Sequence, residues 1–559
     1  MNLELQQVGQ VAAGGTILNI AEAADGTLWL ASPAGLFCQD GQSWRSQTVP
    51  LARVGTILAA GKTLWAGGID GTLWRSHSKG ERWLRCLIEQ TDAPITSLAA
   101  SPNYQTDRVL LAGTTDKGIL RSTNGGKHFE LVNFGLESLA IFDLAVASVW
   151  SARHEFAFAI TGDGVYWSPN GGRGWRKAIV DAMMQPVTIA VSPHFGEDST
   201  VYVGCHGGEV LVSADKGRTF TQLTDLSKPI TTLTCITNDT LLIGTVADVT
   251  RLATNGEHLS TTASDEEAIC LHASSGNAYV GTLRGLRKSA DNGQTWQTAN
   301  NLAARRFIWF ETPSVDCWFV AGPDEGVFCS NDQGASWRSV WTNSDILSVY
   351  TKGEQLWIGT PEGIYLSENQ GTSWASVLNQ PTITAILKTD AALWSGDHQA
   401  HIWRNGMAIK TPFAGADLLG LYGDHQAVIA SVWRSDAKVT QLWLTGNEGR
   451  NWQRVFAETT KRIIPQVGGG LVGIGRKLYQ QTRSGWQSVE TPSPIVSIIA
   501  SGKQTFIVHS DQIALFENGT LTPIPVALDK HHIAAASIQD GKLLICSTTG
   551  QLWHSTIGF

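Results

Sequence analysis

One pattern of about forty residues recurs from one end of the chain to the other, and it constrains the fold more than any other feature. Each copy has an apolar strand ending near Gly, a short polar loop, a second strand, and a polar turn that closes on an aromatic residue. Clear copies are VYVGCHGGEVLVSADKGRTF, AYVGTLRGLRKSADNGQTW, CWFVAGPDEGVFCSNDQGASW and LWIGTPEGIYLSENQGTSW. An alternating strand such as PVTIAVSP precedes each copy, and a short polar strand such as WRSV follows it. The period of two and the short turns predict four antiparallel β-strands per copy.

The first strand of the unit can be located fourteen times along the chain. The starts lie at Ile17, Val54, Ile95, Phe142, Val187, Ile230, Ile269, Phe307, Ile346, Ile383, Leu418, Ile464, Ile495 and Ile533. Four-stranded units arranged radially close into rings of about four to eight blades. Fourteen units therefore predict an all-β chain of two tandem β-propellers, with seven blades of four antiparallel strands in each.

We place the first propeller at residues 1–303 and the second at 304–559, with the boundary in the stretch ANNLAARR. The last unit, HIAAASIQDGKLLICSTTGQLWHSTIGF, stops after its third strand. The N-terminal segment LELQQVG has strand character and belongs to no complete unit. We therefore predict that a strand within residues 2–9 completes the last blade.

Six copies carry the same turn between the third and fourth strands. These are SADKGRTF, SADNGQTW and SNDQGASW, and the Asn-containing STNGGKHF, SPNGGRGW and SENQGTSW. The Asp or Asn side chain can accept backbone N–H groups of its own turn, the Gly suits a positive φ, and the aromatic ring can pack between blades. The predicted structural residues are Ser213, Asp215, Gly217, Phe220, Ser289, Asp291, Gly293, Trp296, Ser330, Asp332, Gly334 and Trp337.

This turn resembles the Asp-box, or BNR, repeat, and the resemblance covers nearly the whole chain. Families with this repeat include sialidases, xyloglucan-degrading glycosidases with two seven-bladed propellers, and non-catalytic propellers such as photosystem assembly factors and sortilin-type receptor domains. The resemblance implies the fold and not the chemistry.

The two enzymatic classes fit the sequence less well than the binding class. A sialidase needs several converging arginines and a Tyr and Glu pair, and the nearest Arg-Ile-Pro string is KRIIPQV at 461. A double-propeller glycosidase needs two carboxylates about 5–10 Å apart across a cleft between the rings. Such enzymes carry long cleft-building insertions, whereas this chain has few long loops. We predict no catalytic residue, no metal and no cofactor.

The loops between second and third strands are the candidate binding face. Their residues are Asp70, Asp116, Lys117, Asp163, His206, Asp248, Arg284, Asp324, Glu325, Glu362, Asp397, His398 and Arg434. Longer insertions occur at 133–140, 181–185, 300–307 and 432–441. We predict a non-catalytic protein-binding platform or structural subunit of a larger assembly. The alternative is a glycan-binding or glycan-hydrolysing double propeller of the xyloglucanase type.

Composition narrows the partners further. The chain has 41 Lys and Arg against 49 Asp and Glu, a net charge of -8, which disfavours nucleic acid as a partner. No signal peptide or transmembrane run is seen, so we expect a cytoplasmic protein. The eight cysteines show no metal spacing and are expected as buried thiols. Packing roles are expected for second-strand tryptophans, namely Trp29, Trp65, Trp318, Trp357, Trp394 and Trp443.

Overall fold

The computed structural model describes residues 6–556, apart from certain short segments. These are 11–14, 42, 48, 50–53, 89–92, 152–153, 182, 264–266, 275, 299–307, 313–316, 324, 343–344, 353–354, 381, 425–426, 459–463, 466–470, 475, 483–484, 502–503, 518, 525–532, 540–541 and 548–550. The candidate Asp324, the insertion 300–307 and the boundary segment ANNLAARR lie outside the described residues.

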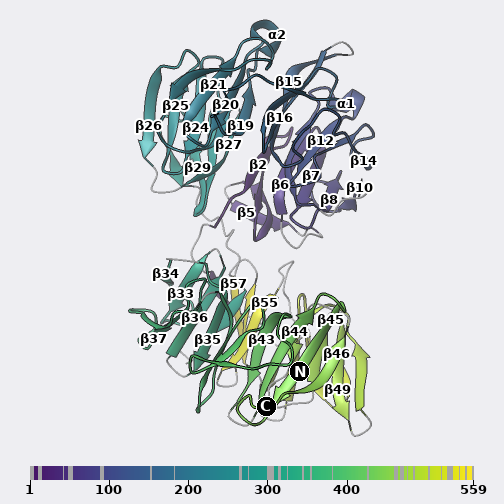
Figure 1. The fold of residues 1–559 in the computed structure, drawn as a ribbon, viewed down its shortest axis with the longest axis vertical. Coiled ribbons are helices and arrows are strands. Elements are labelled where there is room, and N and C mark those ends of the chain that lie inside the picture. Colours follow the sequence, from purple (N-terminus) through teal and green to yellow (C-terminus); the bar gives the residue numbers. More distant parts are fainter. Residues whose placement is uncertain are drawn as a thin grey trace. The chain divides into compact units, whose positions relative to one another are not determined.

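The described strands form fourteen sheets, antiparallel except for one parallel pair, β10 (Leu87–Ile88) with β14 (His128–Leu131), and the chain divides into two compact units (Figure 1). One unit is Ala13–Ala304, called here the first propeller. The other combines Met1–Ala12 with Arg305–Phe559 and is called the second propeller. The predicted dividing point at 303/304 lies next to the observed one, and the N-terminal segment belongs with the second unit.

The innermost strands of the first propeller form a closed ring. Each contacts the next in chain order, and the last contacts the first. They are β2 (Asn19–Glu22), β6 (Val54–Ala60), β11 (Ile95–Ala100), β15 (Ile141–Ser151), β19 (Pro186–Val191), β23 (Ile230–Cys235) and β27 (Ala268–Ser274). Seven sheets around one axis make a seven-bladed propeller.

The second propeller repeats this arrangement with seven more sheets, and its last inner strand contacts its first. Its inner strands are β31 (Trp309–Glu311), β35 (Ser348–Lys352), β39 (Ile383–Lys388), β43 (Asp417–Gly423), β47 (Ile464–Pro465), β51 (Ile495–Ser501) and β55 (Ile533–Gln539). Every predicted start lies within two residues of an observed inner strand. The prediction of two seven-bladed propellers is confirmed.

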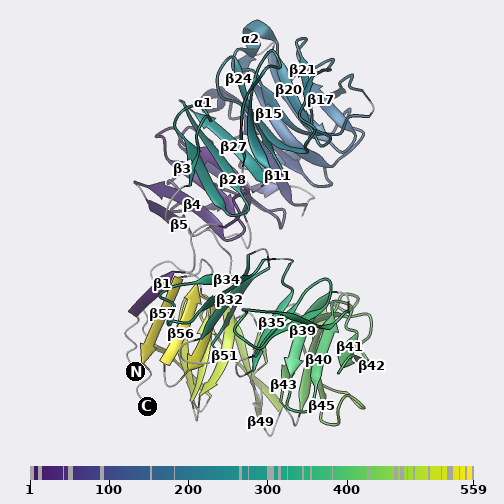
Figure 2. The same ribbon diagram turned by 90° about the vertical axis from the view of Figure 1, so that its left-hand side faces the viewer.

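The second ring is closed by the N-terminal strand. Strand β1 (Gln6–Gln10) pairs antiparallel with β57 (Gln551–Thr556), which gives the sheet order β1-β57-β56-β55. Figure 2 shows β1, in purple, beside the yellow β57. Because the two ends of the chain share one blade, the ring is held by backbone hydrogen bonds rather than by a covalent link at that point.

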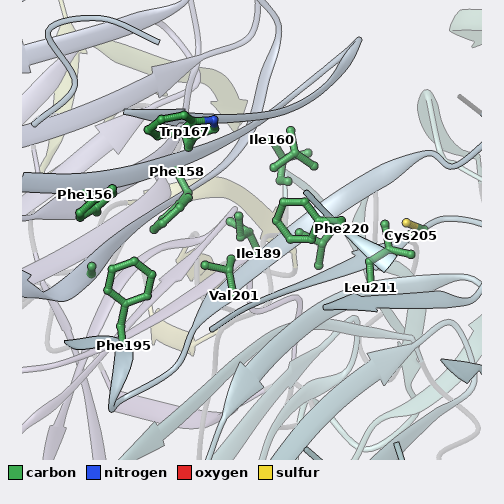
Figure 3. Close-up of a cluster of buried hydrophobic side chains, with 13 residues drawn as sticks. Phe156, Phe158, Ile160, Trp167, Ile189, Phe195, Val201, Cys205, Leu211 and Phe220 are labelled. Carbon is green, nitrogen blue, oxygen red and sulfur yellow. The ribbon is translucent and has the colours of Figure 1, made fainter. Parts of the chain in front are cut away.

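The core lies between neighbouring blades. In the cluster of Figure 3, Phe158 from β16 (His154–Thr161) packs with Phe195 of the next blade, their ring centroids 5.7 Å apart, and with Phe220. Burial of each such ring contributes on the order of 1.5–3 kcal/mol. Second-strand tryptophans are likewise buried, namely Trp29, Trp65, Trp318, Trp357 and Trp394. The assignment of Trp443 to a second strand is wrong, because it lies in β45 (Val439–Thr445), the third strand of its sheet.

The Asp-box turn is held by its own side chains. The Ser213 hydroxyl donates to Asp215 Oδ1 at 2.7 Å and accepts the N–H of Gly217 at 2.9 Å. Asp215 also accepts the backbone N–H groups of Arg218 and Thr219 at 3.0 and 2.9 Å. Lys216 and Gly217 both have positive φ, 67° and 77°. The turns at Ser289 and Ser330 form the same bonds to Asp291 and Asp332.

Two single-turn helices depart from the all-strand expectation. They are α1 (Tyr104–Asp107) and α2 (Phe195–Asp198), and each follows an inner strand. A Ser-Pro pair precedes each helix by one residue, and each helix buries one ring, Tyr104 or Phe195. The predicted insertion 432–441 is mostly strand rather than loop, because its ends belong to β44 (Val428–Arg434) and β45 and lengthen the hairpin between them.

In the described part of the chain, no helix is long and apolar enough to cross a membrane.

Candidate binding site

The predicted binding residues all follow second strands. Because the strands of a blade are antiparallel, these turns lie at the same end as the connections from each fourth strand to the next blade, and we call this end the loop face. Described members are Asp70 after β7 (Thr63–Gly68), Asp116 and Lys117 after β12 (Leu110–Thr114), Asp163 after β16, His206 after β20 (Val201–Cys205), Asp248 after β24 (Thr240–Thr245), Arg284 after β28 (Asn277–Thr282), Glu325 after β32 (Trp318–Gly322), Glu362 after β36 (Gln355–Gly359), Asp397 and His398 at the end of β40 (Leu393–Asp397), and Arg434 at the end of β44.

Most of the charged candidates bond within their own turn. Asp70 accepts the N–H and hydroxyl of Thr72, and Glu362 accepts the Thr360 hydroxyl at 3.0 Å. Arg434 donates twice to Asp436, at 3.1 and 2.8 Å. These bonds shape the turns, as Asx-type side chains do elsewhere. They do not draw candidates from different blades into one site.

Asp163 is the centre of a polar cluster that has a structural role. It accepts hydrogen bonds from Lys177, Tyr166 and the Thr161 hydroxyl at 2.7, 2.8 and 2.6 Å. Partial burial opposes the ionised form, but these donors outweigh it and lower the pKa of Asp163 to about 2. Lys177 also pairs with Glu137 at 2.8 Å. A carboxylate with this many donors is a poor proton donor in catalysis.

Five further candidates differ in how far their side chains are exposed to solvent. Asp397 is buried and accepts from His401 Nδ1 at 2.8 Å, and Asp248 is buried and pairs with Lys228 at 2.5 Å. Glu325 is also buried, whereas His206 and His398 are exposed. Among the residues that the structure describes, no three His, Cys, Asp or Glu side chains form a metal-binding group.

Glu362 lines a pocket. A pocket of about 560 Å³ lies at the junction of two blades of the second propeller. Its lining residues are Ser339, Val340, Trp341, Thr342, Glu362, Tyr365 and Trp374. Trp341 ends β34 (Arg338–Trp341), Tyr365 lies in β37 (Ile364–Ser367), and Trp374 precedes β38 (Ala375–Leu378).

Three aromatic rings meet at this pocket. The Trp341 centroid lies 4.8 Å from that of Tyr365 and 5.0 Å from that of Trp374, and the two tryptophans pack edge to face. Trp374 is oriented by its indole N–H, which donates to the Val340 carbonyl at 2.9 Å. The arrangement combines aromatic surface with a carboxylate and hydroxyl groups, as ligand pockets commonly do. Sequence reasoning missed Trp341, although a second Trp four residues after Trp337 was a signal.

The loop face of the first propeller carries exposed apolar side chains. Ile69, Val246 and Leu283 lie in second-to-third-strand turns, Met183 lies in a fourth-to-first-strand connection, and Phe142 is the second residue of β15. Met183 is 86% exposed, whereas its neighbour Met184 packs against the core. Clusters of exposed apolar groups on a rigid surface are typical of interaction sites.

Two carboxyl groups on inner strands have raised pKa values. Burial raises the pKa of Asp143 to about 6 against hydrogen bonds from the Ile189 and Leu144 amides and the Thr188 hydroxyl. Burial likewise raises the pKa of Glu311 to about 7, opposed by the Thr351 hydroxyl at 2.8 Å. The described hydrogen-bond donors to the two carboxyl groups are hydroxyls and backbone amides.

Comparison with known proteins gives matches in structure only. No protein-family model and no curated protein matches the chain. The GH74 xyloglucanase from Xanthomonas campestris is similar over 100% of both chains, with 14% identity and a TM-score of 0.67. An ancestral GH74 enzyme covers 100% of this chain and 99% of its own, with 13% identity and a TM-score of 0.59.

PorZ, a surface component of the type-IX secretion system of Porphyromonas gingivalis, is similar over 99% of this chain and 86% of its own, with 11% identity and a TM-score of 0.51. The chain is a double β-propeller. Hydrolases and a secretion-system component share this fold, and identities of 11–14% do not decide between enzyme and binding protein.

Proposed function

We propose that this double propeller is a glycan-binding protein and that the pocket around Trp341, Tyr365, Trp374 and Glu362 is its binding site. The single observation that carries the proposal is that the half-buried rings of Tyr365 and Trp374 meet the exposed Glu362 carboxylate at one open pocket, with the buried Trp341 packed behind them. The apolar faces of sugar rings pack on aromatic side chains, and sugar hydroxyls donate to carboxylates.

The pocket geometry favours binding over cleavage. Among the described residues that line the pocket, Glu362 is the one carboxylate, and it already accepts a hydrogen bond from the Thr360 hydroxyl. Glycoside hydrolysis needs two carboxyl groups at a defined separation. The pocket therefore supports recognition of an oligosaccharide without a catalytic step of its own.

The test is a titration of the full-length chain with xyloglucan oligosaccharides and other plant and bacterial glycans, followed by calorimetry. Glu362→Gln and Tyr365→Phe should each weaken binding about tenfold, since each removes one polar contact to the sugar. Glu368→Gln is the matched control, because Glu368 lies in the same blade outside the pocket, where it bonds Gln355. Binding unaffected by both pocket variants would refute the proposal. Release of reducing sugar would show hydrolysis instead.

The second candidate function is a protein-binding platform, and the apolar loop face of the first propeller favours it. Ile69, Val246 and Leu283 expose two-fifths or more of their surface at turns of three separate blades. The triple variant Ile69→Ser, Val246→Ser and Leu283→Ser should abolish a stoichiometric complex that wild-type protein forms on affinity capture. A partner retained equally by both proteins would argue against this face.

A further inference from the structure

Three successive blade junctions of the first propeller expose a large apolar side chain at the same structural position. The residues are Leu87, Phe134 and Ile179, exposed by 67%, 83% and 72%. Each follows the fourth strand of its blade, namely β9 (Leu84–Arg85), β14 (His128–Leu131) and β18 (Arg176–Lys177).

Backbone hydrogen bonds show that the three positions are equivalent. The Leu87 N–H donates to the Lys127 carbonyl, and the Ile179 N–H donates to the Arg218 carbonyl, each in the Asp-box turn of the next blade. Phe134 also bonds to the Asp-box turn of the next blade. The Phe134 carbonyl accepts the N–H of Trp175, which closes that turn, and the Ile179 carbonyl accepts the N–H of Phe220 in the same way. Strands β10 (Leu87–Ile88) and β14 consequently run side by side in Figure 1.

These side chains are held outward by rigid backbone. The segment around Phe134 is bonded at several points, since the Gly118 N–H donates to Leu139, the Gly162 N–H donates to Ala140, and the Asn133 amide donates to Lys117. These bonds hold the backbone of the loop in a conformation in which the Phe134 ring is 83% exposed.

Exposed cations lie beside Leu87 and Ile179, at the two ends of this apolar row. Arg85, Lys127, Arg176 and Arg218 are exposed and form no ion pair within the part of the chain that the structure describes. Arg176 and Arg218 both lie over the Trp167 ring, 5.2 and 5.3 Å from its centroid. Because the whole chain has a net charge of -8, this local excess of positive charge is a feature of the rim and not of the composition.

Two blades of the second propeller bury the equivalent sequence position. Leu87 and Ile179 lie four residues after the aromatic residue that closes the Asp-box turn, and Trp341 and Phe456 lie four residues after Trp337 and Trp452, within their fourth strands, where they are 7% and 8% exposed. Both rings turn into the junction, where Trp341 meets Tyr365 and Phe456 meets Tyr479. The repeat can therefore bury this position, and the first propeller leaves it exposed three times in a row.

We propose that the rim strip, defined as Leu87, Phe134 and Ile179 with Arg85, Lys127, Arg176 and Arg218, docks an acidic, apolar segment of a partner protein. Carboxylates of the segment would pair with the four cations while its apolar side chains cover the exposed row. Consecutive blades are rotated by roughly one seventh of a turn about the propeller axis, so a chain segment can follow the three positions.

The proposal is tested by selecting a random-peptide phage library on the full-length protein and measuring the selected peptides by fluorescence anisotropy. We expect peptides rich in Asp, Glu and large apolar residues, with affinity that falls as salt is raised. The charge variant Arg85→Glu, Arg176→Glu, Arg218→Glu and the apolar variant Leu87→Ser, Phe134→Ser, Ile179→Ser should each weaken binding by about tenfold or more. All six residues are exposed, so both proteins should fold.

The matched control is Val377→Ser with Met407→Ser, which removes two exposed apolar side chains from outer strands of the second propeller. It should bind like wild type. Selected peptides that are basic, or that bind all variants equally, would overturn the proposal. Stronger retention of the protein on anionic lipid vesicles than on any selected peptide, lost in the same variants, would also overturn it. Glycan binding is measured separately at the second propeller, so the two proposals fail independently.

Discussion

Replacing Gly217 by Ala tests how the Asp-box turn joins two blades. Gly217 has φ +77°, and a Cβ added there would lie 2.5 Å from Cε1 of Phe158, which belongs to the preceding blade. Phe158 is fully buried in the cluster of Figure 3 and cannot withdraw without opening that cluster. The substitution therefore strains the turn and also forces the two blades apart.

The expected loss of unfolding free energy in Gly217→Ala is the sum of two terms. A left-handed backbone conformation costs a non-glycine residue about 1–2 kcal/mol. Inserting a methyl group into a close-packed cluster costs about 1–3 kcal/mol more. The sum, about 2–5 kcal/mol, corresponds to a fall in melting temperature of about 4–10 °C for a unit of this size.

Gly26→Ala is the matched control for the backbone part. Gly26 lies in the same propeller with φ +81°, and its added Cβ would meet only a Glu22 side-chain oxygen at 4.0 Å. This variant should lose about 1–2 kcal/mol, or roughly 2–4 °C. Differential scanning calorimetry of the full-length variants gives both shifts in the transition of the first propeller.

Equal shifts for Gly217→Ala and Gly26→Ala would refute the reasoning, since contact with Phe158 would then contribute nothing. A double variant sharpens the result. Phe158→Leu vacates space beside the new methyl group, so its destabilisation and that of Gly217→Ala should be less than additive. Strict additivity would again argue against a direct contact.

Three further predictions concern the turn, the ring closure and the inner strands. Ser213→Ala leaves the buried Gly217 N–H without its acceptor and should cost about 1–3 kcal/mol in urea unfolding, whereas Thr219→Val, which removes an exposed hydroxyl bond to Asp215, should cost less than about 1 kcal/mol. Deleting residues 2–10 removes β1 and leaves β57 as an open edge, so the second propeller should melt at lower temperature and aggregate, and an unchanged transition would contradict closure by β1. The raised pKa of Glu311, about 7 against 4.5, means that the folded state holds a proton that the unfolded state releases between these values. Stability of the second propeller should therefore fall as pH rises through that window, and the fall should be smaller in Glu311→Gln when melting is followed at both ends of the window.

The fold could be predicted because its determinants are local and repeated. Each blade is specified by signals that lie within about twenty residues. These signals are the alternation of apolar and polar residues, the Ser-x-Asp-x-Gly turn and the aromatic residue after it. The N-terminal strand was predictable for the same reason, since LELQQVG had strand character and HIAAASIQDGKLLICSTTGQLWHSTIGF was one strand short.

The candidate site was predictable only in part. Glu362 was singled out as a loop carboxylate, but nothing local distinguished it from Asp70 or Asp163, which the structure shows bonding within their own blades. The rim strip could not be recognised from the repeat either. Leu87 and Ile179 lie four residues after the aromatic residue that closes the turn, whereas Phe134 lies five residues after it because Asn133 is an extra residue.

The sequence by itself determined the number of blades, the order of strands and the turns that close them, because strand period and turn chemistry act between near neighbours in the chain. Only the tertiary structure decided which repeat positions are buried and which face solvent. Trp341 turns inward to meet Tyr365 and Trp374, whereas Ile179 at the same repeat position remains in water. The difference arises from the blade that packs next to each residue, and such contacts between blades are not encoded in any single repeat.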